Sequence, residues 1–466
     1  MGNVLLRFFQ YVCKFNFGRF EREEFKKFLR MGLIFALIIG VYWTLRPLKD
    51  GIFIALVDKH QLPFAKTISV LALLPLVMFY TRLLERFSRE TMLKILPAFY
   101  GTVIVIFSLV MSLVQCGAQD LAATSTFFLV LIRGLGYLWY LFVESFGSLI
   151  IALFWAFAAD TTKPTQAKRG FPLVVAIGQM GGIVLPYTVG GLPHRLGCNT
   201  DFLSMIILGL LTLFIIPLVR YFLRATPKKQ LASFHGKNEQ YEKKKQEPGF
   251  LEGLKLLLKN RYLLGIFAAN FIYEVVITIF DYNFKLSAST AFTGVAFTRY
   301  LSIYASSVNI VSLGCLLLGI SNITRFLGVG VALAAMPVIV GLALFGFLTL
   351  DTLTFLFSLM VGSKAINYAL NGPALKQLYI PTTPDVKFKA QAWIETFGSR
   401  LSKQGGSVFN MTLAPLQRAL GAIAGRAQYL AYSAFLCFPL LVLWLIVAVY
   451  LGHTFKTAVK NKTVVC

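Results

Sequence analysis

Charged residues are scarce in this sequence: they make up 14% of its 466 residues, against 57% for hydrophobic residues. A water-soluble protein of this length needs more polar residues to cover its surface, so the composition excludes a soluble globular protein. Apolar runs of about 20 residues, the length of a helix that crosses a bilayer, recur along most of the chain. These runs do not alternate between apolar and polar residues, which excludes a transmembrane β-barrel. The sequence therefore predicts an all-α, polytopic membrane protein.

The motifs of several classes of enzyme are missing. The chain has no GxxxxGK[ST] loop, so it is not expected to hydrolyse ATP. The six cysteines lie far apart and include no CxxC pair, and the four histidines fall in predicted loops or tails. We therefore predict no metal, no haem or other cofactor, and no enzymatic activity. Cys116 and Cys198 both fall in predicted external loops, where they either form a disulfide or remain small apolar residues.

Acidic residues are also few, with 20 Asp and Glu against 45 Lys and Arg, and the net charge is +25. In a soluble protein this excess would indicate a nucleic-acid partner, but the positions of the charges argue against one. Basic residues gather in the first 30 residues and in every second connection between apolar runs, while the connections near 58–65, 116–126 and 350–352 have almost none. This alternation follows the positive-inside rule and predicts that both termini are cytoplasmic.

The N-terminal segment, residues 1–30, has no long apolar core and is not expected to be a signal peptide. Residues 4–20 interleave apolar and basic side chains. They form either an amphipathic helix on the membrane surface or a frayed cytoplasmic tail.

Twelve membrane-spanning helices are predicted, six on each side of a polar, basic linker. They are expected at 31–56, 66–84, 91–115, 131–159, 170–192, 201–223, 262–286, 296–320, 325–350, 353–379, 390–416 and 428–451. The predicted domains are the cytoplasmic segment 1–30, the first half 31–224, the linker 225–261, the second half 262–452 and the cytoplasmic tail 453–466.

Small residues recur at corresponding places in the two halves. The fifth predicted helix contains Gly181 and Gly182, and the eleventh contains Gly405 and Gly406. Such glycines let helices approach closely. With six helices on each side of the linker, this echo favours two parallel repeats in a major-facilitator-like fold, in which the halves rock around a midplane site.

Charged side chains inside the predicted helices are the candidate functional residues, because burying a charge in a membrane is costly. Glu274, Asp281 and Lys285 are spaced by seven and four residues, which places them on one face of the seventh helix. Both signs of charge occur, with a slight excess of cations, and this suits a multivalent anion such as a polyphosphate. The alternative is that the charges only pair with one another, as Asp281 and Lys285 can at their spacing. The candidate substrate-binding residues are Lys49, Glu144, Asp281, Lys285, Lys364, Asn371, Arg400 and Lys403.

Three acids are candidate proton carriers: Glu144, Asp281 and Glu395. For each, the alternative is a structural ion pair. Arg46 is expected to reach toward the membrane interface.

Aromatic residues in the predicted helices offer surfaces on which a nucleobase can stack, although such residues also serve as packing or interface anchors. The candidates are Tyr42, Trp43, Trp155 and Tyr368.

Several of these motifs, in order, resemble those of the bacterial and plastid nucleotide transporter family, which contains the ATP/ADP translocases of intracellular bacteria. Residues 45–50, LRPLKD, resemble the family's L-R-x-x-K-D, and residues 144–148, ESFGS, resemble E-L-W-G-S. Residues 281–285, DYNFK, are similar to E-V-T-W-K, and residues 400–407, RLSKQGGS, to R-L-G-K-S-G-G-S. Residues 371–376, NGPALK, depart from the family's F-D-P-T-K-E and lose its acid.

The resemblance implies twelve helices in a bacterial inner membrane and exchange of ATP for ADP or transport of another nucleotide. It also implies that Lys49, Glu144, Asp281, Lys285 and Lys403 lie in the substrate path. The leading hypothesis is nucleotide antiport by alternating access. The alternative is proton-coupled symport of another nucleotide or organic anion. The expected partners are this small-molecule anion and membrane lipid, and the protein is expected to act as a monomer.

Overall fold

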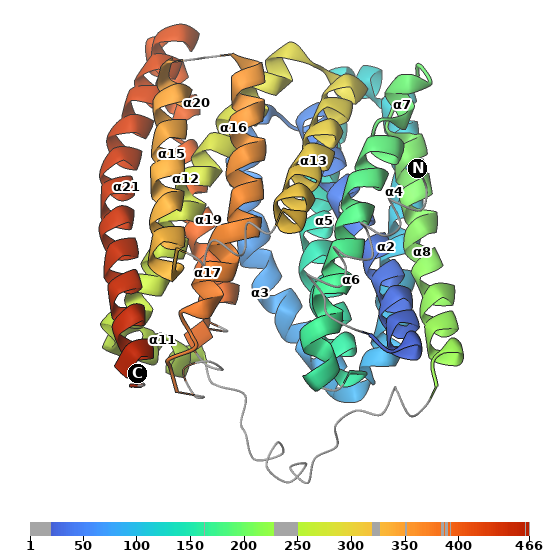
Figure 1. Ribbon diagram of the computed structural model, residues 1–466. Helices are drawn as coiled ribbons and strands as arrows, with labels where there is room; N and C mark the ends of the chain where they lie inside the picture. The colour runs from blue at the N-terminus through green and yellow to red at the C-terminus, as the bar shows by residue number, and fades with distance from the viewer. Residues whose placement is uncertain are drawn as a thin grey trace, which may run out of the picture. The chain divides into compact units, whose positions relative to one another are not determined.

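The computed structural model describes residues 20–162, 164–227, 250–318, 327–349, 352–383 and 393–461, with 386, 390, 391 and 463–465. Within these ranges the chain is helical and contains no β-strand (Figure 1). This confirms the predicted all-α fold class.

Eleven helices of the described part are long and apolar enough to cross a membrane. In the first part of the chain the helices are α2 (Arg22–Leu56), α3 (Leu62–Arg86), α4 (Arg89–Thr124), α5 (Thr126–Asp160), α6 (Pro164–Leu185) and α8 (Phe202–Ala225). In the second part they are α12 (Arg261–Ala291), α13 (Gly294–Leu317), α15 (Val329–Thr349), α16 (Leu353–Ile366) and α21 (Ala422–Asn461). The span that begins with α16 continues through the π-helical turn η4 (Asn367–Asn371) into α17 (Gly372–Gln377).

Shorter elements connect these helices. They are η1 (Lys59–Gln61), the π-helical turn η2 (Pro186–Gly190), α7 (Leu192–Arg195), α11 (Phe250–Lys259), the π-helical turn η5 (Ile394–Gly398), α19 (Ser399–Asn410) and α20 (Leu413–Leu420).

The predicted eleventh span, 390–416, differs from the others. Its described residues form η5, α19 and the start of α20, and it does not meet the length and hydropathy required of the other spans. The reason is its composition, because α19 (SRLSKQGGSVFN) holds two basic residues and several small polar ones in 12 residues.

The contacts between Cα atoms divide the chain into two compact units. Unit 1 comprises Met1–Lys237 and Ser289–Leu313, and unit 2 comprises Asn238–Ala288 and Gly314–Cys466. This division differs from the halves predicted from the sequence in the segment Ser289–Leu313, most of which belongs to α13. Polar contacts tie this segment to α6: Ser306 Oγ donates to the Ile183 carbonyl at 2.9 Å, and Gln179 Nε2 lies 3.1 Å from Ser312 Oγ.

Glycines allow one pair of helices in each unit to pack closely. In unit 1, a Cβ on Gly181 of α6 would clash with the carbonyl oxygen of Ala36 in α2. In unit 2, a Cβ on Gly406 of α19 would lie 2.8 Å from the carbonyl oxygen of Val275 in α12. These glycines are the ones that echo each other in the sequence, so both units use the same device for packing.

Replacing Gly181 by alanine is expected to destabilise the protein by about 1–3 kcal/mol, because the added methyl group meets backbone atoms that cannot rotate away. The measurement is the thermal unfolding temperature of the purified protein in detergent. Gly341→Ala in α15 is the matched control, because no atom lies within 4 Å of its Cβ position. A helix gains about 0.5–1 kcal/mol from Gly to Ala where there is room. Equal unfolding temperatures for the two variants would contradict the packing argument.

Candidate functional site

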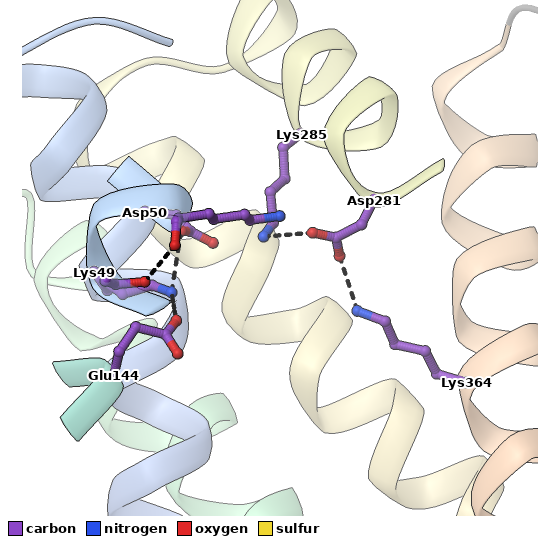
Figure 2. Close-up of polar contacts among 8 residues, drawn as sticks. Lys49, Asp50, Glu144, Asp281, Lys285 and Lys364 are labelled. Carbon is purple, nitrogen blue, oxygen red and sulfur yellow. Dashed lines mark hydrogen bonds and ion pairs between the residues drawn. The ribbon is translucent and has the colours of Figure 1, made fainter. Parts of the chain in front are cut away.

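The first charged cluster lies in unit 1, where α2 meets α5 (Figure 2). Lys49 Nζ donates a short hydrogen bond to Glu144 Oε1 and lies 3.7 Å from Asp50 Oδ1. The ammonium group also sits 4.0 Å from the centroid of the Tyr140 ring, within the range of a cation–π interaction. Lys49 and Asp50 are buried, at 4% and 3% exposure, while the Glu144 side chain is 37% exposed. Lys49 therefore faces two acids, Asp50 and Glu144.

The second charged cluster lies in unit 2, where α12 faces α16. Asp281 Oδ2 accepts from Lys285 Nζ at 2.7 Å, one turn along α12, and Asp281 Oδ1 accepts from Lys364 Nζ at 2.8 Å (Figure 2). All three side chains are about nine-tenths buried. Asp281 therefore faces two lysines, one with each carboxylate oxygen.

The second cluster has the chemistry of an anion site. Burying a charge is costly unless it is paired, and here both carboxylate oxygens of Asp281 are used to neutralise two ammonium groups. An anion with several negative charges can replace Asp281 as the partner of both lysines, because ammonium groups bind phosphate oxygens as point charges. The arrangement thus suits a polyphosphate and makes its binding a competition with a residue of the protein.

The other predicted site residues lie along the same helices of unit 2. Lys403 of α19 pairs with Glu274 of α12 at 3.7 Å, and Arg400 lies on α19 nearly one turn before Lys403. Asn371 is 2% exposed in the π-helical turn η4, and its Nδ2 donates to Asn367 Oδ1 at 2.8 Å. π-Helical turns are frequent at functional sites.

The candidate proton carriers have different surroundings. Asp281 lies between two ammonium groups, and a proton there would remove one ion pair from each of them. Glu144 pairs with Lys49 and is partly exposed. Glu395 is exposed in η5 and accepts from Gln391 Nε2 at 2.8 Å. On charge balance, Glu144 and Glu395 are better suited than Asp281 to bind and release a proton.

The aromatic candidates are placed in several environments. The Tyr42 ring packs on Gly147 of α5, and the Arg46 guanidinium lies over the rings of Tyr42 and Trp43. Trp155 packs against protein rings, with 5.0 Å between its centroid and that of Phe35. Tyr368 is 46% exposed.

Two residues of these clusters, Asp50 and Tyr140, were not selected from the sequence, and Glu274 was placed on the charged face but not among the substrate-binding residues. Asp50 carries a detectable signal, because it is an acid within a predicted membrane span. Tyr140 carries none, because an aromatic residue in an apolar helix is unremarkable until the lysine that lies over its ring is known.

Another buried acid, Asp201, lies at the start of α8, outside the membrane-spanning segments. Its Oδ2 accepts from Thr298 Oγ1 of α13 at 3.0 Å, and its Oδ1 has no hydrogen-bond partner among the described residues. Burial raises the pKa of this carboxyl from 3.8 to about 6, and the hydrogen bond from Thr298 opposes only part of the shift.

The raised pKa of Asp201 predicts that stability depends on pH. The folded protein binds this proton more tightly than the unfolded chain, so stability should rise as the pH falls from about 6 toward about 4, by at most about 3 kcal/mol. Asp201→Asn should therefore unfold at a higher temperature than the wild type at neutral pH and lose this pH dependence. The measurement is the unfolding temperature in detergent across this pH range. The control Asp160→Asn, at an exposed side chain, should keep the wild-type profile; an unchanged profile for Asp201→Asn would contradict the assignment.

Comparisons with known proteins give concordant results. The family model described as TLC ATP/ADP transporter matches residues 9–455. ADP,ATP carrier protein 1 of Rickettsia typhi is 24% identical over 483 residues, and that of Rickettsia bellii is 25% identical over 489 residues. Both matches cover 95% of this chain and 95% of the relative.

Among solved structures, a bacterial homologue of the iron transporter ferroportin has a TM-score of 0.63 at 11% identity, covering 92% of this chain and 98% of that chain. A nucleoside transporter has a TM-score of 0.56 at 15% identity, covering 92% and 99%. At these identities the structural matches concern the fold alone.

Proposed function

We propose, because the chain belongs to the TLC ATP/ADP transporter family, that it exchanges nucleotides across a membrane by alternating access, ATP for ADP. The observation that carries the site assignment is the cluster in which Lys285 and Lys364 share the single carboxylate of Asp281. Two buried ammonium groups provide the positive charge and the hydrogen-bond donors that bind the phosphates of a nucleotide.

In this proposal the substrate acts by replacing an internal ion pair. The phosphates replace Asp281 as the partner of the two lysines, and the ion pairs with Asp281 form again when the phosphates leave. Because the cluster is neutralised to nearly the same extent in both cases, binding and release avoid an intermediate with two unpaired buried cations. Lys49 pairs with Glu144 and Asp50 in unit 1, and we propose that it also takes part in transport.

The protein is an integral membrane protein. We place it in a bacterial inner membrane, because the relatives are carriers of Rickettsia, and with both termini in the cytoplasm, because the basic connections alternate along the chain. It acts in this proposal as a lipid-embedded monomer that moves its substrate without altering it chemically.

Proton-coupled symport is the second candidate, and one observation favours it. Glu144 pairs with Lys49 and its side chain is partly exposed, so a proton from solvent can reach the carboxylate and compete with the lysine. Glu144→Gln should then abolish uptake driven by a pH gradient and spare nucleotide exchange.

The test is uptake of labelled ATP by bacterial cells that express this chain, followed by a chase with unlabelled ADP or ATP. Efflux of label that requires external nucleotide and continues with a protonophore present supports exchange. Uptake that collapses with the protonophore supports symport instead. No nucleotide uptake in cells whose membranes contain the protein would contradict both forms of the proposal.

A further inference from the structure

A cavity of about 220 Å³ lies within unit 2, lined by residues of α12, α17, η5 and the start of α19. Part of its wall is apolar, from Ile266 and Leu375, and four polar side chains face it: Asn270, Lys376, Glu395 and Ser399. An apolar wall with a few placed polar groups is typical of small-molecule sites. The volume is below the roughly 300–1,000 Å³ that encloses a drug-sized ligand, so the cavity suits a fragment of a larger substrate.

The cavity stands at one end of the charged face of α12. Asn270, Glu274, Asp281 and Lys285 are spaced by four, seven and four residues, which aligns them along one side of the helix. At about 1.5 Å per residue, Asn270 lies about 16 Å along the helix from Asp281. This separation is comparable with the length of an extended nucleoside triphosphate.

Residues of η5 and α19 follow the same direction. Glu395, Ser399 and Lys403 succeed one another at spacings of four, and Lys403 pairs with Glu274 at 3.7 Å. The Glu274–Lys403 pair therefore lies between the cavity and the Asp281 cluster along α12. The cavity, this ion pair and the cluster therefore succeed one another along α12, and we refer to the three together as the polar track of unit 2.

The composition of the cavity differs from that of the cluster. The cluster has two cations for one acid, while the cavity has one cation, one acid, an amide and a hydroxyl. The carboxylate of Glu395 disfavours a bare phosphate but accepts hydrogen bonds from the amino group of a base or from ribose hydroxyls. The Asn270 amide both donates and accepts, as the edge of a base requires.

Two further residues complete this arrangement. Lys376 forms no ion pair within the part of the chain that the structure describes, so its ammonium group is available to the phosphate nearest the ribose. Tyr379 also lines the cavity, and burial raises the pKa of its phenol, so it presents an uncharged ring.

We propose that this cavity is the nucleoside subsite of the transporter: it holds the base and ribose of a nucleotide whose terminal phosphates lie at Lys285 and Lys364. The inference rests on the proposed function and extends it, because it divides recognition between a phosphate end and a nucleoside end of one track.

The test compares binding of ATP with binding of inorganic tripolyphosphate, which has the phosphates and lacks the nucleoside. Full-length protein in lipid nanodiscs is titrated with each ligand by calorimetry. Ser399→Phe fills the cavity and should weaken ATP binding at least tenfold while leaving tripolyphosphate unchanged. Lys364→Gln should weaken both ligands. Ser358→Phe, at an exposed position of α16 outside the cavity, is the matched control and should change neither.

Asn270→Ala provides a second variant without added bulk. It removes the amide hydrogen bonds and should weaken ATP binding about fivefold, again with tripolyphosphate unchanged. The subsite would be overturned if neither cavity variant changed the affinity for ATP. It would also be overturned if Ser399→Phe weakened the binding of ATP and of tripolyphosphate to the same extent. A wild-type protein that binds no nucleotide would instead overturn the proposed function.

Discussion

Lys49→Gln is expected to lower ATP/ADP exchange by about 100-fold or more, the largest effect of any single substitution in unit 1. Lys49 is the cation that holds Glu144 and Asp50 and lies over the Tyr140 ring. Removing one partner of a buried ion pair costs about 3–5 kcal/mol, because the remaining charges lose their counter-ion. Each 1.4 kcal/mol corresponds to about a tenfold change. The measurement is the initial rate of exchange, corrected for the amount of protein in the membrane.

Two further variants separate transport from folding. Lys94→Gln breaks the exposed pair with Glu90, which is worth less than about 1 kcal/mol, and should leave exchange unchanged. The double variant Lys49→Gln with Glu144→Gln removes one of the two acids that Lys49 contacts and should restore part of the amount of folded protein without restoring exchange. If Lys49→Gln alone retained exchange at the wild-type rate, Lys49 would have no part in the site.

Asp281→Asn is expected to raise the affinity for anions about tenfold and to lower exchange about 100-fold. The asparagine cannot neutralise Lys285 and Lys364, so both ammonium groups lose the ion pair with this carboxylate and attract an anion more strongly. ATP should then bind more tightly, because it no longer competes with a carboxylate, and should leave more slowly. The measurements are the dissociation constant for ATP and the rate of exchange in the same preparation.

Substitution of a neighbouring residue is expected to change the ATP affinity in the opposite direction, which makes this prediction specific. Lys364→Gln should weaken ATP binding, although it contacts the same carboxylate. ATP should also raise the unfolding temperature of Asp281→Asn more than that of the wild type, since a ligand that binds the folded state stabilises it according to its affinity. Glu90→Gln, in the exposed pair with Lys94, is the control and should alter none of these quantities. Weaker ATP binding by Asp281→Asn would mean that Asp281 does not compete with the substrate.

Much of the fold was predictable because a bilayer imposes its requirements on each helix separately. An apolar run of sufficient length is enough to predict a membrane-spanning helix, whatever the helices around it. Eleven such helices are present in the described part of the chain. Residues 390–416 were harder to assign, because a helix with Gly405, Gly406 and two basic residues is stabilised by its contacts with α12 rather than by lipid. The grouping of Ser289–Leu313 with unit 1 was not predictable, because it depends on tertiary contacts of α13.

The candidate site likewise has one part that the sequence predicts and another that depends on tertiary contacts. The shared face of Glu274, Asp281 and Lys285 follows from helical spacing, so the sequence was sufficient to predict it. The contact of Lys364 with Asp281 depends on how α16 packs on α12, over a separation of 83 residues. The hydrogen bond between Thr298 and Asp201 likewise joins elements far apart in the chain. Such pairs carry no local pattern, and only the folded structure identifies the partners.

The charge balance of the two clusters has an electrical consequence. The ion pairs of the two clusters join three acids to three lysines, so these six residues add to zero formal charge. Charges fixed in the protein cancel over a complete exchange cycle, because the transporter returns to its starting conformation, so the net current is set by the difference in charge between the nucleotides exchanged. ATP carries one more negative charge than ADP, and a charge that crosses the whole membrane potential changes the free energy by about 2.3 kcal/mol per 100 mV. The membrane voltage would therefore decide which nucleotide accumulates inside the cell.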